Sequence, residues 1–138
     1  MKTRFLLAAL IFTTGTVLPA APEKKDPIDA AMDKAIEKDP STAGMVQAAA
    51  QAEEKWQKEI DRALAKLKEE LAPEQWAALQ ASQQAWRAYH EKELKTQDAL
   101  YEAMNGTMWR VAAASKAMEL TRERALLLRD YIETLSEG

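Results

Sequence analysis

The chain has 138 residues, of which 47% are hydrophobic and 30% are charged, and its formal net charge is −3. This length has room for one domain, and the balance of apolar and charged residues excludes wholesale disorder. The complete lack of cysteine excludes disulfides, zinc fingers, iron–sulfur clusters, thiol catalysis and a lipidated N-terminal cysteine. Glycine and proline are scarce, while Ala, Glu, Lys, Leu and Gln are abundant, which is typical of helices.

Residues 1–20 have the pattern of a secretory signal peptide. Lys2 and Arg4 supply a positive start, an apolar stretch runs from residue 5 to 17, and a small residue, Ala20, precedes the expected cleavage point. The stretch is shorter than the roughly 20 apolar residues that cross a bilayer. We therefore expect a periplasmic or secreted protein with no stable membrane insertion, and an uncleaved N-terminal anchor helix is the alternative.

Cleavage makes the chain more acidic. Without Lys2 and Arg4 it holds 17 basic and 22 acidic residues, a formal charge of −5. An acidic protein is a poor partner for nucleic acid or anionic lipid, and it suits a basic protein.

Residues 21–40 are predicted to form a polar leader and a short helix. Asp26 is a good N-cap and Pro27 suits the first helical position. Asp39 and Pro40 stop the helix, because proline restricts the residue before it and donates no amide hydrogen. Its apolar stripe is narrow, so we expect this helix to be the least well packed.

Three long helices are predicted within residues 41–138, over about 41–71, 73–104 and 107–136, with breaks at Ala72-Pro73 and Asn105-Gly106-Thr107. Gly106 suits a left-handed helix end and Thr107 can cap the next helix. Apolar residues recur every three or four positions, as in a bundle. The predicted seams are Met45, Ala49, Ala52, Trp56, Ile60, Ala63, Leu67 and Leu71; then Trp76, Leu79, Trp86, Tyr89, Leu100 and Met104; then Val111, Ala114, Met118, Thr121, Ala125, Leu128, Ile132 and Leu135.

The predicted fold is therefore all-α, a bundle of three long antiparallel helices with a short additional N-terminal helix. Short connections make successive helices antiparallel neighbours, so residues equidistant from a break face each other. The pairs expected to meet are Ile60 with Trp86, Trp56 with Tyr89, and Leu94 with Lys116.

The sequence offers little for catalysis. His90 is the single histidine, so neither a catalytic triad nor a multi-histidine metal site can be built from it. A histidine–carboxylate site with Glu93, one helical step away, remains possible. No phosphate-binding loop, nucleophile elbow or dinucleotide fingerprint occurs. We predict a protein that is not an enzyme and has no cofactor or metal.

The helix predicted over 73–104 has one irregularity. Its seam continues through four polar residues where a bundle needs apolar ones: Gln83, His90, Glu93 and Gln97. Buried polar groups without partners cost about 1–3 kcal/mol. The helix could rotate to bury Tyr89 and Leu94 instead, the four residues could form a polar layer, or they could face water beside a groove. In the last case they are the candidate binding groove.

The tryptophans at helical spacing are predicted to lie in the core rather than to stack on bases. Trp109, Met104 and Met108 are expected to cover one end of the bundle. The alternative is an exposed end surface for a partner protein.

The stretch from Leu71 to Arg129 carries a family resemblance. Its elements are Leu79-x-x-x-Gln83-x-x-Trp86-x-x-Tyr89, Asn105-Gly106-Thr107 and Leu120-Thr121-x-x-Arg124. They resemble the LprI-like family of small exported bacterial proteins, and we assign residues 41–138 to such a domain. The family usually has arginine where His90 stands and a cysteine pair at the positions of Leu94 and Lys116.

The resemblance implies an exported helical protein that binds and inhibits lysozyme in the cell envelope. Lysozyme or another basic envelope protein is then the expected partner. The alternative is a periplasmic protein-interaction or chaperone-like module with no lysozyme activity.

Overall fold

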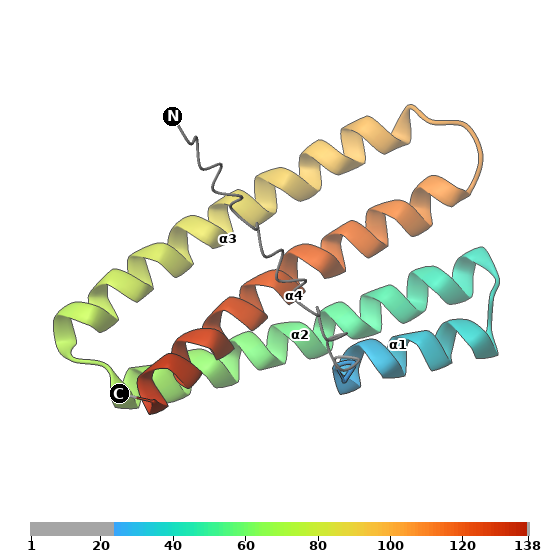
Figure 1. Cartoon of the computed structure of the whole chain (residues 1–138). Coiled ribbons are helices and arrows are strands. Elements are labelled where there is room, and N and C mark those ends of the chain that lie inside the picture. Colours follow the sequence, from blue (N-terminus) through green and yellow to red (C-terminus); the bar gives the residue numbers. More distant parts are fainter. Residues whose placement is uncertain (1–23, 138) are drawn as a thin grey trace, which may run out of the picture.

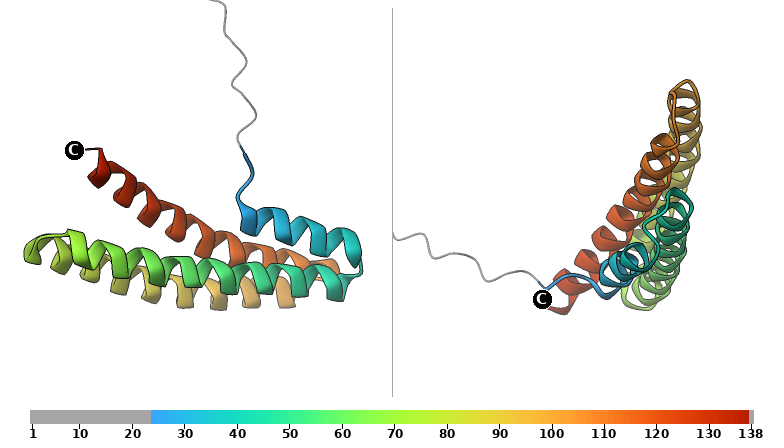
Figure 2. Two further views of the ribbon diagram at one scale, coloured as in Figure 1. Left: turned by 90° about the horizontal axis from the view of Figure 1, so that it is seen from below. Right: turned by 90° about the vertical axis from the view of Figure 1, so that its right-hand side faces the viewer.

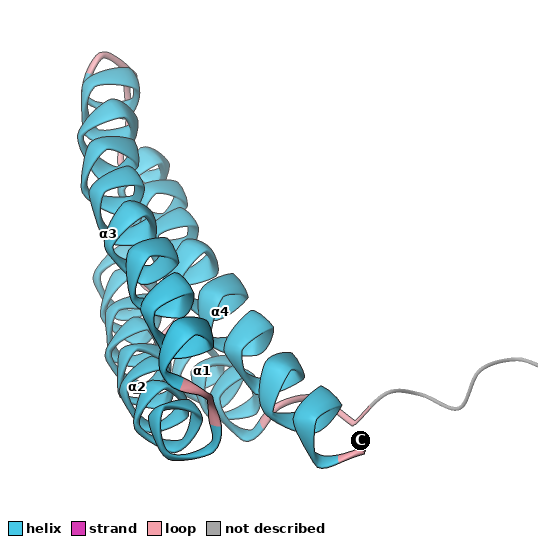
Figure 3. Cartoon of the chain, turned by 90° about the vertical axis from the view of Figure 1, so that its left-hand side faces the viewer, coloured by secondary structure: helices cyan, strands magenta, loops and turns pink. Residues whose placement is uncertain are grey.

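The computed structural model describes residues 24–137, which form four helices and no strand (Figure 3). The helices are α1 (Pro27–Lys38), α2 (Thr42–Glu70), α3 (Pro73–Glu102) and α4 (Met108–Ser136). The all-α prediction is confirmed. The predicted signal peptide lies outside the described residues, and none of the helices described is both long enough and apolar enough to cross a membrane.

Successive helices run in opposite directions, and α4 lies between α2 and α3 in Figure 1. The closest packing joins α2 to α4, and α1 lies along α2. The C-terminal part of α4 rises away from α2 and α3, as Figure 2 shows in its left view. That divergence leaves the region beside the α2–α3 corner less covered than the middle of the protein.

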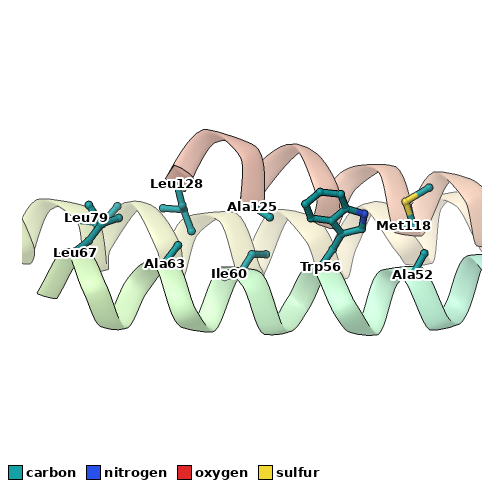
Figure 4. Close-up of a cluster of buried hydrophobic side chains, with 9 residues drawn as sticks. All are labelled: Ala52, Trp56, Ile60, Ala63, Leu67, Leu79, Met118, Ala125 and Leu128. Atoms are coloured by element: carbon teal, nitrogen blue, oxygen red, sulfur yellow. The ribbon is translucent and has the colours of Figure 1, made fainter. Parts of the chain in front are cut away.

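The core is the seam between α2 and α4. The predicted α2 seam is confirmed over its central part, and small residues on that seam allow the α4 backbone to come close. One α3 residue joins this core where α3 leaves the corner (Figure 4). The buried cluster is Ala52, Trp56, Ile60, Ala63, Leu67, Leu79, Met118, Ala125 and Leu128.

The distal half of α3 does not follow the prediction. Tyr89, Leu100 and Met104 were expected in the core, yet they are 51%, 66% and 55% exposed. The buried residues of α3 are Leu79, Gln83 and Gln97, and α3 packs on α4 rather than on α2, so no continuous apolar seam forms along its distal half. A closed bundle of three long helices is therefore not confirmed, and α3 is the long helix with the least packing.

The short helix α1 was expected to be the least well packed, and this was wrong. Ile28 and Met32 pack against the core, and Asp29 is only 7% exposed. The tight corner that lets α1 fold back on α2 depends on Gly44, because a Cβ there would collide with the backbone and side chain of Asp39. The charge contacts that hold α1 are described below.

The helix starts follow their sequence signals. Asp26 Oδ1 accepts a hydrogen bond from the Ile28 amide at 2.9 Å, and Ser41 Oγ accepts one from the Gly44 amide at 3.0 Å. Gly106 has φ of 94° before α4, in the left-handed region predicted for it. Thr107 occupies the N-cap position, but its side chain makes no capping hydrogen bond.

Candidate functional site

A polar cluster joins the three long helices at Thr121. This α4 side chain is fully buried, and its hydroxyl lies 3.2 Å from His90 Nε2 on α3 and 3.4 Å from Glu53 Oε1 on α2. The hydroxyl also lies 3.3 Å from the carbonyl of Ala117. His90 stacks on Trp86 with ring centroids 4.9 Å apart. The cluster supplies α3 with polar contacts where it lacks apolar ones.

The contact between His90 and Thr121 agrees with the hairpin rule. The two residues are equally far along the chain from the break at residues 105–106, and they touch across α3 and α4. The three residue pairs that the rule predicted to meet are a separate question. Trp86 packs against the core cluster that contains Ile60, and Tyr89 is 51% exposed. Contacts of Ile60 with Trp86, Trp56 with Tyr89, and Leu94 with Lys116 stay predictions.

A second polar contact centres on Arg124, which is 7% exposed. Its Nε donates to Gln83 Oε1 at 2.8 Å, and its Nη2 donates to Ser82 Oγ at 3.3 Å. Its guanidinium lies 6.0 Å from the ring centroid of Trp86. Burial lowers the pKa of Arg124, because the charged form loses hydration. No carboxylate of the described residues forms an ion pair with it.

Two other arginines of α4, Arg122 and Arg129, form ion pairs with carboxylates of other helices and of the α1 N-cap. Arg122 donates from Nε to both carboxylate oxygens of Asp29 on α1, at 3.2 and 2.9 Å. Arg129 bridges Asp26, at 2.7 Å, and Glu59 on α2. The hydrogen bond from Arg129 lowers the pKa of Glu59, since it favours the ionised carboxylate. These contacts clamp α1 onto α2 and α4.

The same two arginines cover Trp56. Their guanidinium carbons lie 5.6 Å (Arg122) and 5.0 Å (Arg129) from the Trp56 ring centroid, within the range of cation–π attraction. Trp56 is therefore buried by charged side chains as well as by the α4 seam. The sequence pattern identified Trp56 as core but gave no sign of the arginines that cover it.

An apolar groove lies where the end of α4 diverges from the α2–α3 corner. Its cavity volume is about 390 Å³. The walls come from the end of α2, the start of α3 and the end of α4. Four of the nine lining residues are leucine, and four carry hydroxyl or amide groups. The lining residues are Leu67, Leu71, Gln75, Ala78, Leu79, Ser82, Tyr131, Thr134 and Leu135.

The four predicted site residues have different environments. Gln83 and Gln97 are buried, whereas His90 and Glu93 are half-buried. Gln83 binds Arg124 and His90 binds Thr121. Three arrangements were predicted as alternatives for these polar residues. The structure shows a polar layer for Gln83 and His90, and the helix rotation that would bury Tyr89 does not occur. A ligand-binding role for the four stays a prediction.

The α3–α4 end differs from the expected core packing. Met104 and Met108 were predicted to cover the end of the bundle, but they are exposed, as is Leu100 on the last turns of α3. Trp109 is half-buried. We call Leu100, Met104 and Met108 the tip surface. It corresponds to the exposed end surface that was the alternative sequence interpretation.

The described residues hold no group of three or more His, Asp or Glu side chains that could bind a metal ion. The Thr121 cluster resembles a nucleophile and base in composition only. Glu53 lies beside the same His90 nitrogen that faces the hydroxyl, at 4.0 Å, so it does not orient the ring from the opposite nitrogen as a triad acid does. The buried hydroxyl is also out of reach of a substrate.

Comparisons with known proteins agree with this architecture. The chain is similar to a solved structure of an uncharacterized protein from Burkholderia thailandensis, with a TM-score of 0.77 and 34% sequence identity. The match covers 83% of this chain and 58% of that one, so this chain spans less than two thirds of that protein's length. The search among curated proteins finds no match. The family model described as lysozyme inhibitor LprI matches residues 32–128, from within α1 to near the end of α4, and the chain belongs to this family.

Proposed function

We propose that this protein is an exported helical binding protein that binds and inhibits lysozyme in the cell envelope. The observation that carries the proposal is the match of the lysozyme inhibitor LprI family over residues 32–128. In this proposal the protein acts by binding, without chemistry of its own.

The charge of the chain supports a basic partner. After loss of residues 1–20 the chain has a formal charge of −5. Complementary charge raises the association rate of two proteins more than it raises their final affinity, and salt screens this effect. We therefore expect inhibition to develop more slowly as the salt concentration rises.

The tip surface is the contact surface that we assign to lysozyme. Leu100, Met104 and Met108 are 66%, 55% and 60% exposed, and acidic Asp98 and Glu102 accompany them on the last turns of α3. Exposed apolar side chains close in sequence to acidic ones suit a basic partner, because apolar anchors supply affinity and the charges steer the encounter. Methionine can adapt its shape to a partner surface.

The decisive experiment is a turbidity assay of bacterial cell-wall lysis with purified mature protein. We expect micromolar protein at low salt to slow lysis by lysozyme. An unchanged rate of lysis would refute the proposed function. A pull-down from envelope extract that recovers another specific protein would then favour the interaction or chaperone-like module.

Variants test the surface separately from the function. Replacing all three tip residues with serine should reduce inhibition at least tenfold without lowering the unfolding midpoint. Leu127→Ser removes an exposed leucine of α4 outside the tip surface and serves as the control. If the triple variant inhibits as well as the wild type does, the tip assignment is wrong although the function stands.

A further inference from the structure

Three arginines of α4 contact other helices, and they are not equivalent. Arg122 and Arg129 are bound by carboxylates of α1 and α2. Arg124 lies between them in sequence, is itself only 7% exposed, and has only the side chains of Gln83 and Ser82 as acceptors among the residues described. A buried charge without a counter-charge is costly, by several kcal/mol in general, so this site is prepared for an anion.

The buried arginine lies behind the wall of the apolar groove. Ser82 lines the groove and accepts a hydrogen bond from Arg124 Nη2, so the two share one polar contact. Tyr131 also lines the groove. Gln83, the other partner of Arg124, has a buried Nε2 with no acceptor among the described protein atoms. Ser82 therefore connects the groove to the buried donors of Arg124 and Gln83.

The shape and lining of the groove limit the class of ligand. Its volume of about 390 Å³ is near the small end of ligand pockets. Except at Leu71, its walls are helices, whose backbone groups bond within the helix. An extended peptide would leave its own amides unpaired against such walls, at a cost for each. An alkyl chain needs no hydrogen bonds.

We propose that this groove binds a single-chain fatty acid, with the alkyl chain against Leu67, Leu71 and Leu79 and the carboxylate at Ser82 and Arg124. The carboxylate accepts from the Ser82 hydroxyl and from Arg124 Nη2, which releases the long 3.3 Å bond between those two residues. An ion pair between the guanidinium and a carboxylate then replaces a hydrogen bond from the guanidinium to a neutral hydroxyl. The groove is remote in sequence from the tip surface, and this site does not depend on lysozyme inhibition.

Isothermal titration calorimetry of the mature protein with decanoate, below the concentration at which decanoate aggregates, tests the proposal. We expect saturable binding at one site. The control ligand is 1-decanol, which has the same chain length and no charge, and we expect it to bind at least tenfold more weakly. Equal binding of the two ligands, or no saturable binding of decanoate, would overturn the proposal.

Two variants locate the site. Arg124→Gln should remove the preference for decanoate over 1-decanol, while Arg87→Gln, which removes an exposed arginine of α3, should keep it. Ala78→Phe fills the groove from an exposed position and should abolish binding of both ligands with the helical circular dichroism unchanged. If Arg124→Gln fails to fold, the Ala78→Phe variant and the comparison of decanoate with 1-decanol still test whether the ligand binds in the groove. Decanoate binding unaffected by Ala78→Phe would place the ligand elsewhere and refute the site.

Discussion

Replacing Asp29 with asparagine tests whether charge holds α1 on the rest of the protein. Asp29 is buried, and its carboxylate receives hydrogen bonds from Arg122 Nε and lies 2.9 Å from Arg122 Nη2. The Arg122 side chain is 35% exposed, so water can partly replace the lost partner. The cost should therefore lie between that of an exposed ion pair and that of a buried one, about 1–3 kcal/mol.

The effect should be local to α1. Hydrogen exchange of backbone amides measures this directly, because opening of α1 alone exposes only its own amides. A loss of about 1–3 kcal/mol corresponds to exchange from α1 that is roughly 5- to 150-fold faster, with α2 and α4 little changed. Asp33→Asn is the matched control on the same helix, since Asp33 pairs with Lys25 at an exposed position and should change exchange less than about threefold.

A double-mutant cycle identifies the partner. Combining Asp29→Asn with Arg122→Gln should cost less than the sum of the two single changes, with a coupling of about 1 kcal/mol or more. Additive effects would show that the pair contributes nothing beyond packing. Equal exchange from α1 in the Asp29→Asn and Asp33→Asn variants would refute the reasoning, and so would a uniform loss of protection over all helices.

Three further predictions concern stability in urea unfolding. Thr121→Val keeps the volume but removes the hydroxyl that contacts His90, and should cost about 1–2 kcal/mol; an unchanged midpoint would show that the cluster is not stabilising. The hydrogen bond from Arg129 lowers the pKa of Glu59. The ionised carboxylate therefore stabilises the fold at pH values above its usual pKa of about 4.3. This contribution is lost as the pH falls through the lowered pKa of the folded state. Glu59→Gln should therefore be less stable at neutral pH and lose less on acidification; the same pH dependence as the wild type would contradict this. Gly44→Ala should cost about 1–3 kcal/mol, since a methyl group there meets the backbone of the α1–α2 corner, and a neutral effect would mean that the corner can shift freely.

Local signals in the sequence were sufficient for the helices and for the main seam. Proline and glycine at the breaks act through backbone conformation, and Asp26 acts through a nearby hydrogen bond. Asp26 and Gly106 have the roles predicted for them. The α2 seam was predicted because regular apolar spacing places those residues on one face whatever packs against it. The family resemblance likewise rested on short motifs that the family match over residues 32–128 now supports.

The candidate site could be found only in part. Gln83 and His90 drew attention as polar residues on an apolar seam, and both are members of the polar contacts between α3 and α4. Their partners were not identified as contacts of α3. Thr121 was predicted only as a member of the α4 seam, and Arg124 appeared only in the family motif, because an arginine on an amphipathic helix is usually a solvated residue. Asp26 was predicted only as the N-cap of a poorly packed helix, and Asp29 was not singled out. Their contacts with Arg129 and Arg122 form only when α4 lies beside them.

The sequence alone therefore determined which segments are helical, where they end and that α2 has a continuous buried face, since each of these depends on residues a few positions apart. Tertiary structure alone decided that α1 is clamped by ion pairs, that α3 stands away from the core and leaves Leu100 exposed, and that Arg124 is buried without an acid. Those outcomes depend on which side chains of distant helices meet, and the sum of such contacts sets the distance and angle between helices.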